Sequence, residues 1–340
     1  MNIERGEQNQ EIKKLGNIEI KKSPDGKILR INEISLQPED KIIVVQRHQK
    51  AAPYTKEDLL ANAGEGKKNM DFIWDPSATD EGAERELILL NEIEQNLGKM
   101  DLIAATPRKR GIRDKKLLNE KFPEARQNEN IDELLDDGEL GLVGDSYFGS
   151  YEYDIEESRK YFRPNATIPW KFPPMNYFEA WVNLGYRSKN SRYKVESPEE
   201  LTQRTSTLLD QLDGEKNYVV THEANCVTFH MLAQRTPEQL RELLNQIEIP
   251  GETRSVIEPK LEGAANFLDL YKLVKQSLTK YPVKGCDYKK VLISILENTK
   301  LKSGTRGYGA VSIYISRKNE EGKKILLEPV YDIQLKESPK

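Results

Sequence analysis

Three short, wholly apolar runs constrain the fold of this chain more than any other feature of its sequence. They occupy residues 42–45, 102–105 and 218–220, and the first and last are rich in β-branched side chains. Runs of this length and composition are typical of strands that are buried on both faces of a parallel sheet. The chain is therefore expected to form an α/β fold with these three strands in its sheet.

Helical periodicity separates the first two runs. Residues 80–97 place apolar side chains at helical spacing and end at Gly98, a common helix stop. The positions expected to face the core are Ala83, Leu87, Leu90 and Leu97. This segment predicts one amphipathic helix between two strands.

Two capping boxes mark later helices. Ser197 and Thr236 are each followed by Pro at the first helical position and by Glu or Gln at the third, which is the signature of a helix start. Further helices are expected over residues 257–279 and 287–298. Strands separated by helices predict a three-layer α/β/α fold with a mainly parallel sheet.

Shorter strand pairs are expected at both ends of the chain. Residues 18–20 and 28–31 flank a Ser-Pro-Asp-Gly turn, and residues 311–315 and 325–327 flank Gly322. Apolar segments separated by a turn that contains Gly are typical of β-hairpins. The sequence therefore predicts one hairpin near each end.

The chain is interpreted as an N-terminal extension followed by one α/β domain. The extension covers residues 1–40 and holds the first hairpin, and the α/β domain covers residues 41–340. Residues 146–196 are rich in aromatic side chains and Pro and have poor periodicity, so they are interpreted as a cap insertion. Residues 231–305 are interpreted as a helical insertion.

Charge and composition restrict the class of partner. The chain has 52 basic and 56 acidic residues and a formal net charge of −4, which argues against binding nucleic acid or an anionic membrane with the whole surface. Two cysteines are too few for a disulfide scaffold. The N-terminus has no apolar core typical of a signal peptide, and no apolar run is long enough to span a membrane. A cytoplasmic protein is expected, and a homodimer is left open.

Basic residues follow each of the three apolar runs. Arg47 and His48 follow the first, Arg110 comes after the second, and His222 comes after the third. Ligands of open α/β sheets bind at the carboxyl ends of the strands, so these side chains are expected to meet if the strands are neighbours. Guanidinium groups match tetrahedral oxyanions, and an anion relieves the repulsion within such a cluster. Phosphate is the ligand that this set predicts.

In their order along the chain, these motifs resemble those of the histidine phosphatase superfamily, the phosphoglycerate-mutase-like phosphatases. The similar segments are Arg47-His48-Gln49, Thr79-Asp80-Glu81-Gly82, Thr106-Pro107-Arg108-Lys109-Arg110, Asp145 before Phe148-Gly149-Ser150-Tyr151-Glu152, and Thr221-His222-Glu223. The order holds from about residue 41 to residue 225, and the C-terminal hairpin also resembles the end of that family's fold. The combination is more specific than any single motif.

The resemblance implies a role for each matching residue. His48 would be the nucleophile that accepts the phosphoryl group, and Asp145 stands where the family has its proton donor, with Glu152 as the alternative donor. The phosphate would be bound by Arg47, Arg110 and His222. Neutral imidazole is a competent nucleophile near neutral pH, in agreement with the first of these roles.

One position departs from the family pattern. Gln49 stands where the family has Gly after the nucleophile, so the way in which the backbone surrounds the phosphate is expected to differ here.

The function expected from these residues is that of a phosphatase, a phosphoric monoester hydrolase that works through a phosphohistidine on His48. A phosphomutase of the same fold and a non-catalytic phospholigand-binding module are the alternatives. With three histidines and no recognised metal-ligand spacing, the enzyme is expected to be metal-independent and to need no cofactor. Its partner is expected to be a small phosphorylated substrate or a phosphoprotein.

Overall fold

A computed structural model describes most of the α/β domain and the N-terminal extension. The described residues are 11–15, 18–49, 79–106, 109–127, 131, 197–284, 286–303, 309–327 and 331–333. The predicted cap insertion at 146–196 lies outside them, and so do Asp145 and Glu152.

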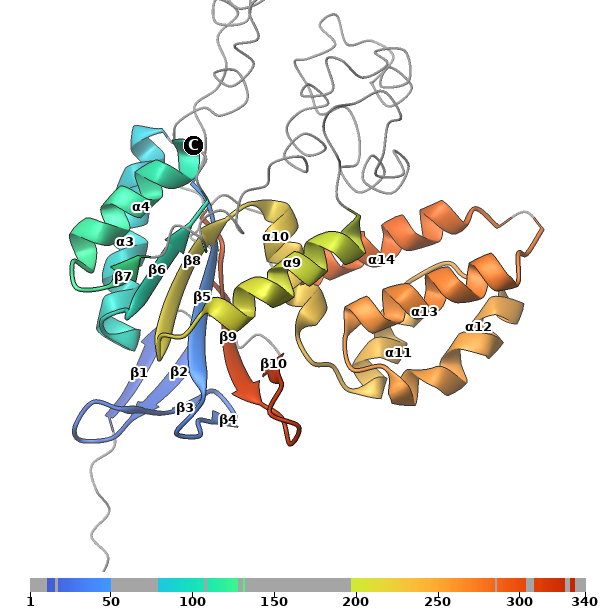
Figure 1. The fold of residues 1–340 in the computed structure, drawn as a ribbon, viewed down its shortest axis with the longest axis horizontal. Coiled ribbons are helices and arrows are strands. Elements are labelled where there is room, and N and C mark those ends of the chain that lie inside the picture. Colours follow the sequence, from blue (N-terminus) through green and yellow to red (C-terminus); the bar gives the residue numbers. More distant parts are fainter. Residues whose placement is uncertain are drawn as a thin grey trace, which may run out of the picture.

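The three apolar runs form three neighbouring strands of the main sheet (Figure 1). They are β5 (Lys41–Arg47), β8 (Lys216–Thr221) and β6 (Leu102–Ala105), and β8 lies between the other two. Both pairings are parallel: Arg47 pairs with Thr221, and Ala105 pairs with Val220. The three strands therefore end at the same edge of the sheet, as the sequence predicts.

Further strands complete the sheet on both sides. The short β7 (Arg126–Gln127) pairs in parallel with β6, and β9 (Val311–Lys318) pairs antiparallel with β5. Both β10 (Lys324–Leu326) and β11 (Tyr331–Ile333) are antiparallel to β9. The α/β fold with a mainly parallel core is confirmed, and so is the C-terminal hairpin, which turns at Gly322 with φ +75°.

Helices cover both faces of the sheet. Alternate side chains of β5 point to opposite faces, so Ile42 and Val44 pack in one cluster with α3 (Asp80–Leu97) and α4 (Lys109–Lys121). Ile43 and Val45 pack in a second cluster with α9 (Pro198–Gln211) and α10 (Glu223–Leu232).

The bounds of α3 match the prediction, but one of its core positions was wrong. Leu90 and Leu97 are buried and Ala83 is half-buried, whereas Leu87 is 44% exposed. The buried stripe instead contains Glu86, because this carboxylate accepts hydrogen bonds at the end of β5 and the helix is rotated to bring it there. A pattern based on apolar residues alone cannot identify such a position.

The N-terminal hairpin is part of a larger sheet. β2 (Ile18–Lys22) and β3 (Ile28–Ile31) form the predicted antiparallel pair. Two strands that were not predicted extend it, β1 (Glu11–Leu15) beside β2 and β4 (Ile34–Ser35) beside β3. The buried isoleucines of this small sheet share the cluster that α3 forms with the main sheet. The boundary at residue 40 stays a prediction.

The region between β8 and β9 contains a helical unit. After α10 come α11 (Pro237–Asn245), α12 (Gly251–Ile257), the 3-10 helix η2 (Glu258–Gly263), α13 (Phe267–Lys280) and α14 (Tyr288–Ser303). The helix expected across residues 257–279 is present, but it is divided between η2 and α13. Pro259 lies in the short 3-10 segment, and a new helix begins only at Phe267, after the cap residue Asn266 accepts a hydrogen bond from the Asp269 N–H.

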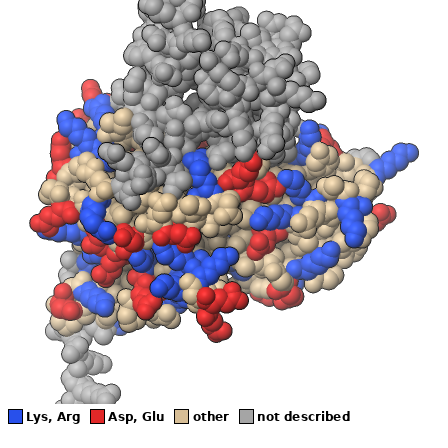
Figure 2. Space-filling model, in the orientation of Figure 1, with Lys and Arg blue, Asp and Glu red and all other residues tan. Residues whose placement is uncertain are grey.

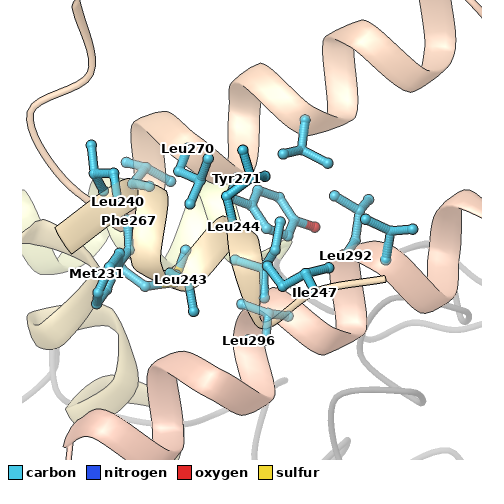
Figure 3. Packing of buried hydrophobic residues seen from close by; sticks show 14 of the residues in the cluster. Met231, Leu240, Leu243, Leu244, Ile247, Phe267, Leu270, Tyr271, Leu292 and Leu296 are labelled. Atoms are coloured by element: carbon cyan, nitrogen blue, oxygen red, sulfur yellow. The ribbon is translucent and has the colours of Figure 1, made fainter. Parts of the chain in front are cut away.

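An apolar core joins this unit to the rest of the domain (Figure 3). Its labelled side chains point toward one another from α10, α11, α13 and α14, and include Leu240, Leu243, Leu244, Phe267 and Tyr271. α10 contributes to this core with Val227 and Met231 and to the sheet core with Cys226 and Phe229. Because it is buried between sheet and helical unit, α10 is held rigidly where it begins, at His222.

Acidic and basic side chains are interspersed over the face seen in Figure 2. Among the described residues, none of the helices combines the length and the apolar character needed to cross a membrane.

Candidate functional site

The ends of β5 and β8 bring three of the predicted site residues together, Arg47, His48 and His222. The parallel ladder continues one residue past the strands: the His48 N–H donates to Thr221 O, and the Thr106 N–H donates to Val220 O, each at 2.9 Å. His222 follows directly as the N-cap of α10. Arg47, His48, Thr106 and His222 therefore leave the sheet at one edge, because the register of the strands requires it.

The two histidines lie side by side. The centroids of the His48 and His222 rings are 5.0 Å apart with an interplanar angle of 61°, and the residues are 3% and 4% exposed. His48 Nδ1 is 2.7 Å from the Gln49 carbonyl oxygen, and His222 Nε2 is 2.9 Å from Thr106 Oγ1. Because a carbonyl oxygen only accepts, His48 Nδ1 carries the hydrogen, and in the neutral ring Nε2 holds the lone pair.

Arg47 lies beside this pair and forms an ion pair with Glu223. Arg47 Nη1 is 2.7 Å from Glu223 Oε2, and the two side chains are 14% and 16% exposed. Glu223 is the first residue of α10. The ion pair orients the guanidinium group and partly neutralises it, so an incoming anion would compete with a carboxylate for Arg47.

A buried polar cluster lies behind the nucleophile, formed by Gln46, Gln49, Glu86, Asp114 and Tyr218. The Gln49 backbone N–H donates to Asp114 Oδ2 at 3.0 Å, and Gln49 Nε2 donates to Glu86 Oε2 at 2.6 Å. Gln46 Nε2 donates to the same Glu86 oxygen, and the Tyr218 hydroxyl donates to Gln46 Oε1. The cluster connects α3 and α4 to the residues on either side of Arg47 and His48.

Burial makes this cluster electrostatically unusual. Desolvation raises the pKa of Glu86 from 4.5 to about 7, although the hydrogen bonds from Gln49 and Gln46 oppose the shift. Burial, and then the charge of Glu86, hold the pKa of Asp114 well above its ordinary value. Burial, and then the charges of Glu86 and Asp114, raise the pKa of the Tyr218 hydroxyl. The two carboxyl groups therefore share less than two full negative charges near neutral pH.

Sequence reasoning missed Glu86 and Asp114, although their positions carried a signal. Glu86 is three residues before Leu89 and Asp114 is four before Leu118, so each lies on the buried stripe of its helix. A carboxylate at a core position of an amphipathic helix indicates a buried polar contact, because an unpaired charge there is strongly destabilising.

Three of the predicted site residues remain outside this geometry. Arg110 lies in the first turn of α4, but its side chain is not among the described ones, and Asp145 and Glu152 lie outside the described residues altogether. The start of α4 does pack closely on the strand edge, since a Cβ atom at Gly111 would collide with Thr106. The roles of all three residues stay predictions.

The third histidine lies elsewhere in α10. His230 is buried in α10, with its ring centroid 5.8 Å from that of Phe267 and Nε2 3.1 Å from Arg235 Nη2. Among the described residues, no group of three or more His, Cys, Asp and Glu side chains is placed to hold a metal ion.

Comparisons with known proteins find similarity in structure only. No protein-family model matches the chain, and no curated protein matches it in sequence. A structure described as a mycobacterial hydrolase is 11% identical, with a TM-score of 0.38 over 84% of this chain and 89% of that chain. A mycobacterial glucosyl-3-phosphoglycerate phosphatase in complex with inorganic phosphate is 10% identical, with a TM-score of 0.36 over 84% and 95%.

A phosphoglycerate mutase from Bacillus anthracis is 11% identical, with a TM-score of 0.33 over 85% of this chain and 92% of that chain. Likeness at this level carries no argument about activity, which must come from the residues themselves.

Proposed function

We propose that the chain is a phosphomonoester hydrolase that acts through a phosphohistidine on His48. The observation that carries the proposal is the convergence of Arg47, His48 and His222 at one sheet edge. The hydrogen bond from His48 Nδ1 to the Gln49 carbonyl leaves Nε2 as the nucleophilic atom. A basic cluster with a preset nucleophile suits phosphoryl transfer, which depends on positioning and charge stabilisation.

The proposed reaction has two steps. In the first, the His48 Nε2 lone pair forms a bond to phosphorus, the ester P–O bond breaks, and the leaving oxygen takes a proton from a carboxylic acid. In the second, water attacks phosphorus, the N–P bond breaks, and the proton released by water returns to the carboxylate. Arg47, Arg110 and His222 would neutralise the charge that develops on the phosphoryl oxygens.

The proposal extends to further expectations from the sequence. It assigns the chain to the three-layer, phosphoglycerate-mutase-like architecture, in the cytoplasm, and to catalysis without a metal or another cofactor. It assigns proton donation to Asp145, with Glu152 as the alternative. Leaving-group dependence tests the donor: Asp145→Asn should slow alkyl phosphate hydrolysis roughly 10²–10⁴-fold and aryl phosphate hydrolysis much less. If Glu152→Gln shows that pattern instead, Glu152 is the donor.

One observation favours a second candidate, the non-catalytic phospholigand-binding module. The carboxylate of Glu223 already forms an ion pair with Arg47, which weakens the attraction for a substrate phosphate. Glu223→Gln separates the two functions. In an enzyme it should lower KM for a phosphate ester, and in a binding module it should tighten phosphate binding while turnover stays absent.

The test of the main proposal is turnover of an aryl phosphate by wild type and by His48→Ala, with His230→Asn as the histidine control. His48→Ala should lose turnover while its circular dichroism spectrum is unchanged, and His230→Asn should retain turnover. Acid-quenched wild type should not keep a phosphoryl label, whereas base-quenched wild type should. Activity should survive EDTA. A requirement for a bisphosphate primer would identify the mutase alternative, and turnover by His48→Ala would overturn the mechanism.

A further inference from the structure

We propose that Glu86 and Asp114 are positioning residues that hold the nucleophile His48 through Gln49. This inference rests on the proposed function for its kinetic consequence. Both carboxylates bind Gln49, at two different groups, and the Gln49 carbonyl in turn binds His48 Nδ1.

The contacts fix Gln49 on three sides. Its backbone N–H donates to Asp114 Oδ2 at 3.0 Å, its side-chain amide donates to Glu86 Oε2 at 2.6 Å, and its carbonyl oxygen lies 2.7 Å from His48 Nδ1. Gln49 is 1% exposed and both carboxylates are fully buried, so water does not compete for these bonds. A residue held at its amide and its side chain presents its carbonyl in one orientation, and that orientation sets the tautomer and the ring plane of His48.

A glycine that packs against the Gln49 side chain completes this arrangement. The Gly309 N–H lies 3.1 Å from Arg47 O and 3.3 Å from His48 O. A Cβ atom at Gly309 would lie 2.5–2.9 Å from the side-chain amide of Gln49. Gly309 also has φ +72°, a conformation that suits glycine. The large side chain at position 49 is therefore accommodated because position 309 has none.

The departure from the family pattern thus has a structural reason. Where the family resemblance leads one to expect Gly after the nucleophile, this chain has a Gln whose side chain is bound by Glu86 and whose volume is matched by Gly309. Glu86 and Asp114 lie on two different helices, α3 and α4, so the packing of both helices on the sheet is coupled to the geometry of His48.

The kinetic test compares Glu86→Leu, which removes the acceptor, with Glu86→Gln, which keeps an amide oxygen in its place. Glu86→Leu should lower kcat roughly 10²-fold, the cost of a misplaced catalytic group, with KM nearly unchanged because the phosphate ligands are intact. Glu86→Gln should restore kcat to within a few-fold of wild type. The matched control is Glu84→Leu, because Glu84 is an exposed carboxylate on the same helix. This change should leave kcat unchanged.

A double-mutant cycle tests whether the effect passes through Gln49. Gln49→Ala keeps the backbone carbonyl but removes the bond to Glu86, so it should lower kcat by itself. Adding Glu86→Leu to Gln49→Ala should then cause little further loss. If the losses in kcat of the two single variants multiply in the double variant, the proposal is overturned, since Glu86 would then act by a route other than Gln49. Should Glu86→Leu fail to fold, Gln49→Ala and Asp114→Leu, which removes the acceptor for the Gln49 N–H, still provide the test, and unchanged kcat in both would overturn it.

A spectroscopic test needs no turnover and so separates this inference from the proposed function. In protein labelled with ¹⁵N-histidine, the ring-nitrogen shifts report the tautomer, and single histidine substitutions assign the three histidines. Wild-type His48 should be a neutral ring with its hydrogen on Nδ1. In Glu86→Leu and Gln49→Ala, His48 should show averaging between tautomers. An Nδ1–H signal that is the same in wild type and both variants would overturn the positioning role even in a protein without activity.

Discussion

The edge of the sheet and the helical unit bury opposite kinds of side chain. Near His48, four polar or ionisable side chains are at most 1% exposed: Gln46, Gln49, Glu86 and Asp114. In the helical unit, the buried cluster of α11, α13 and α14 is almost entirely aliphatic and aromatic (Figure 3). Both regions are well packed, but only the apolar one gains stability from burial without a compensating desolvation cost.

This difference indicates which region was shaped by function. The sheet edge keeps carboxylates whose pKa values are raised by burial, and buried ionisable groups gather at sites that do chemistry. Glu86 Oε1 and Asp114 Oδ1 have no hydrogen-bond partner among the described residues, which is a cost that a purely structural core avoids. The helical unit instead supports α10 from behind and so fixes the position of His222.

Among the changes that compare the two regions, His222→Asn is expected to have the largest effect, and that effect is on activity. Asn is favoured at a helix N-cap, the position that His222 occupies in α10, so the fold should be kept. Loss of the imidazole should lower kcat/KM for an aryl phosphate roughly 10²–10³-fold, the usual cost of removing one group that stabilises developing charge. Steady-state kinetics and a thermal melt on the same protein measure both quantities. Unchanged kcat/KM would remove His222 from the site.

The next effect is on stability, from Leu244→Ala in the helical core. Leu244 is fully buried, and truncation of such a residue costs about 2–5 kcal/mol because a cavity remains. Urea unfolding should show this loss, while kcat of the folded protein stays within a few-fold of wild type. A large fall in kcat would contradict the separation of the two regions, since the helical unit would then shape the pocket itself.

A smaller effect depends on pH and concerns Glu86→Gln. The folded-state pKa of Glu86 is raised from 4.5 to about 7, so the folded protein retains a proton that the unfolded chain releases, and stability falls as pH rises from 4.5 to 7. Glutamine does not titrate. Between pH 5 and pH 8 the variant should therefore gain about 2–3 kcal/mol relative to wild type. The variant also removes the Glu86 charge that raises the pKa of Asp114, and this too favours the variant as the pH rises.

Urea unfolding of both proteins at pH 5, 6 and 8 measures this difference. The change with pH is more informative than the stability at one pH, because any cost of fitting the glutamine amide is the same throughout. A stability difference that does not vary with pH would mean that Glu86 is ionised in the folded state across this range.

The two regions also differ in how far sequence predicts them. The capping boxes at Ser197 and Thr236 form as expected, and the apolar runs become neighbouring strands, because local signals and burial agree there. At the sheet edge, Arg47, His48 and His222 were identified from their order and resemblance. Glu86, Asp114 and Glu223 were not, since the prediction followed apolar and basic residues and did not consider carboxylates at core positions of the helices.

Two further differences between the sequence prediction and the structure also arise where another signal overrides apolar periodicity. Leu87 is exposed because the helix turns Glu86 toward the strand end, a tertiary contact that overrides apolar periodicity. The expected helix over residues 257–279 is divided because Pro259 and the cap at Asn266 outweigh the apolar repeat that continues through them. Arg110, Asp145 and Glu152 keep the roles that the resemblance predicts, untested by the described geometry.

The smallest effect tests the local signals on which the helical unit depends. Thr236 Oγ1 accepts from the Gln239 N–H at 3.3 Å, and the Gln239 side chain accepts from the Thr236 N–H at 2.9 Å. Thr236→Ala removes the first bond and should cost about 1 kcal/mol in urea unfolding. Thr207→Ala is the matched control: Thr207 is an exposed residue inside α9, where Ala is the better helix former, so stability should rise by a few tenths of a kcal/mol. Neither change should alter kcat, because both lie outside the sheet edge. If Thr236→Ala costs no more than its control, the start of α11 is fixed by its buried leucines, and the helical unit depends on tertiary packing rather than on its caps.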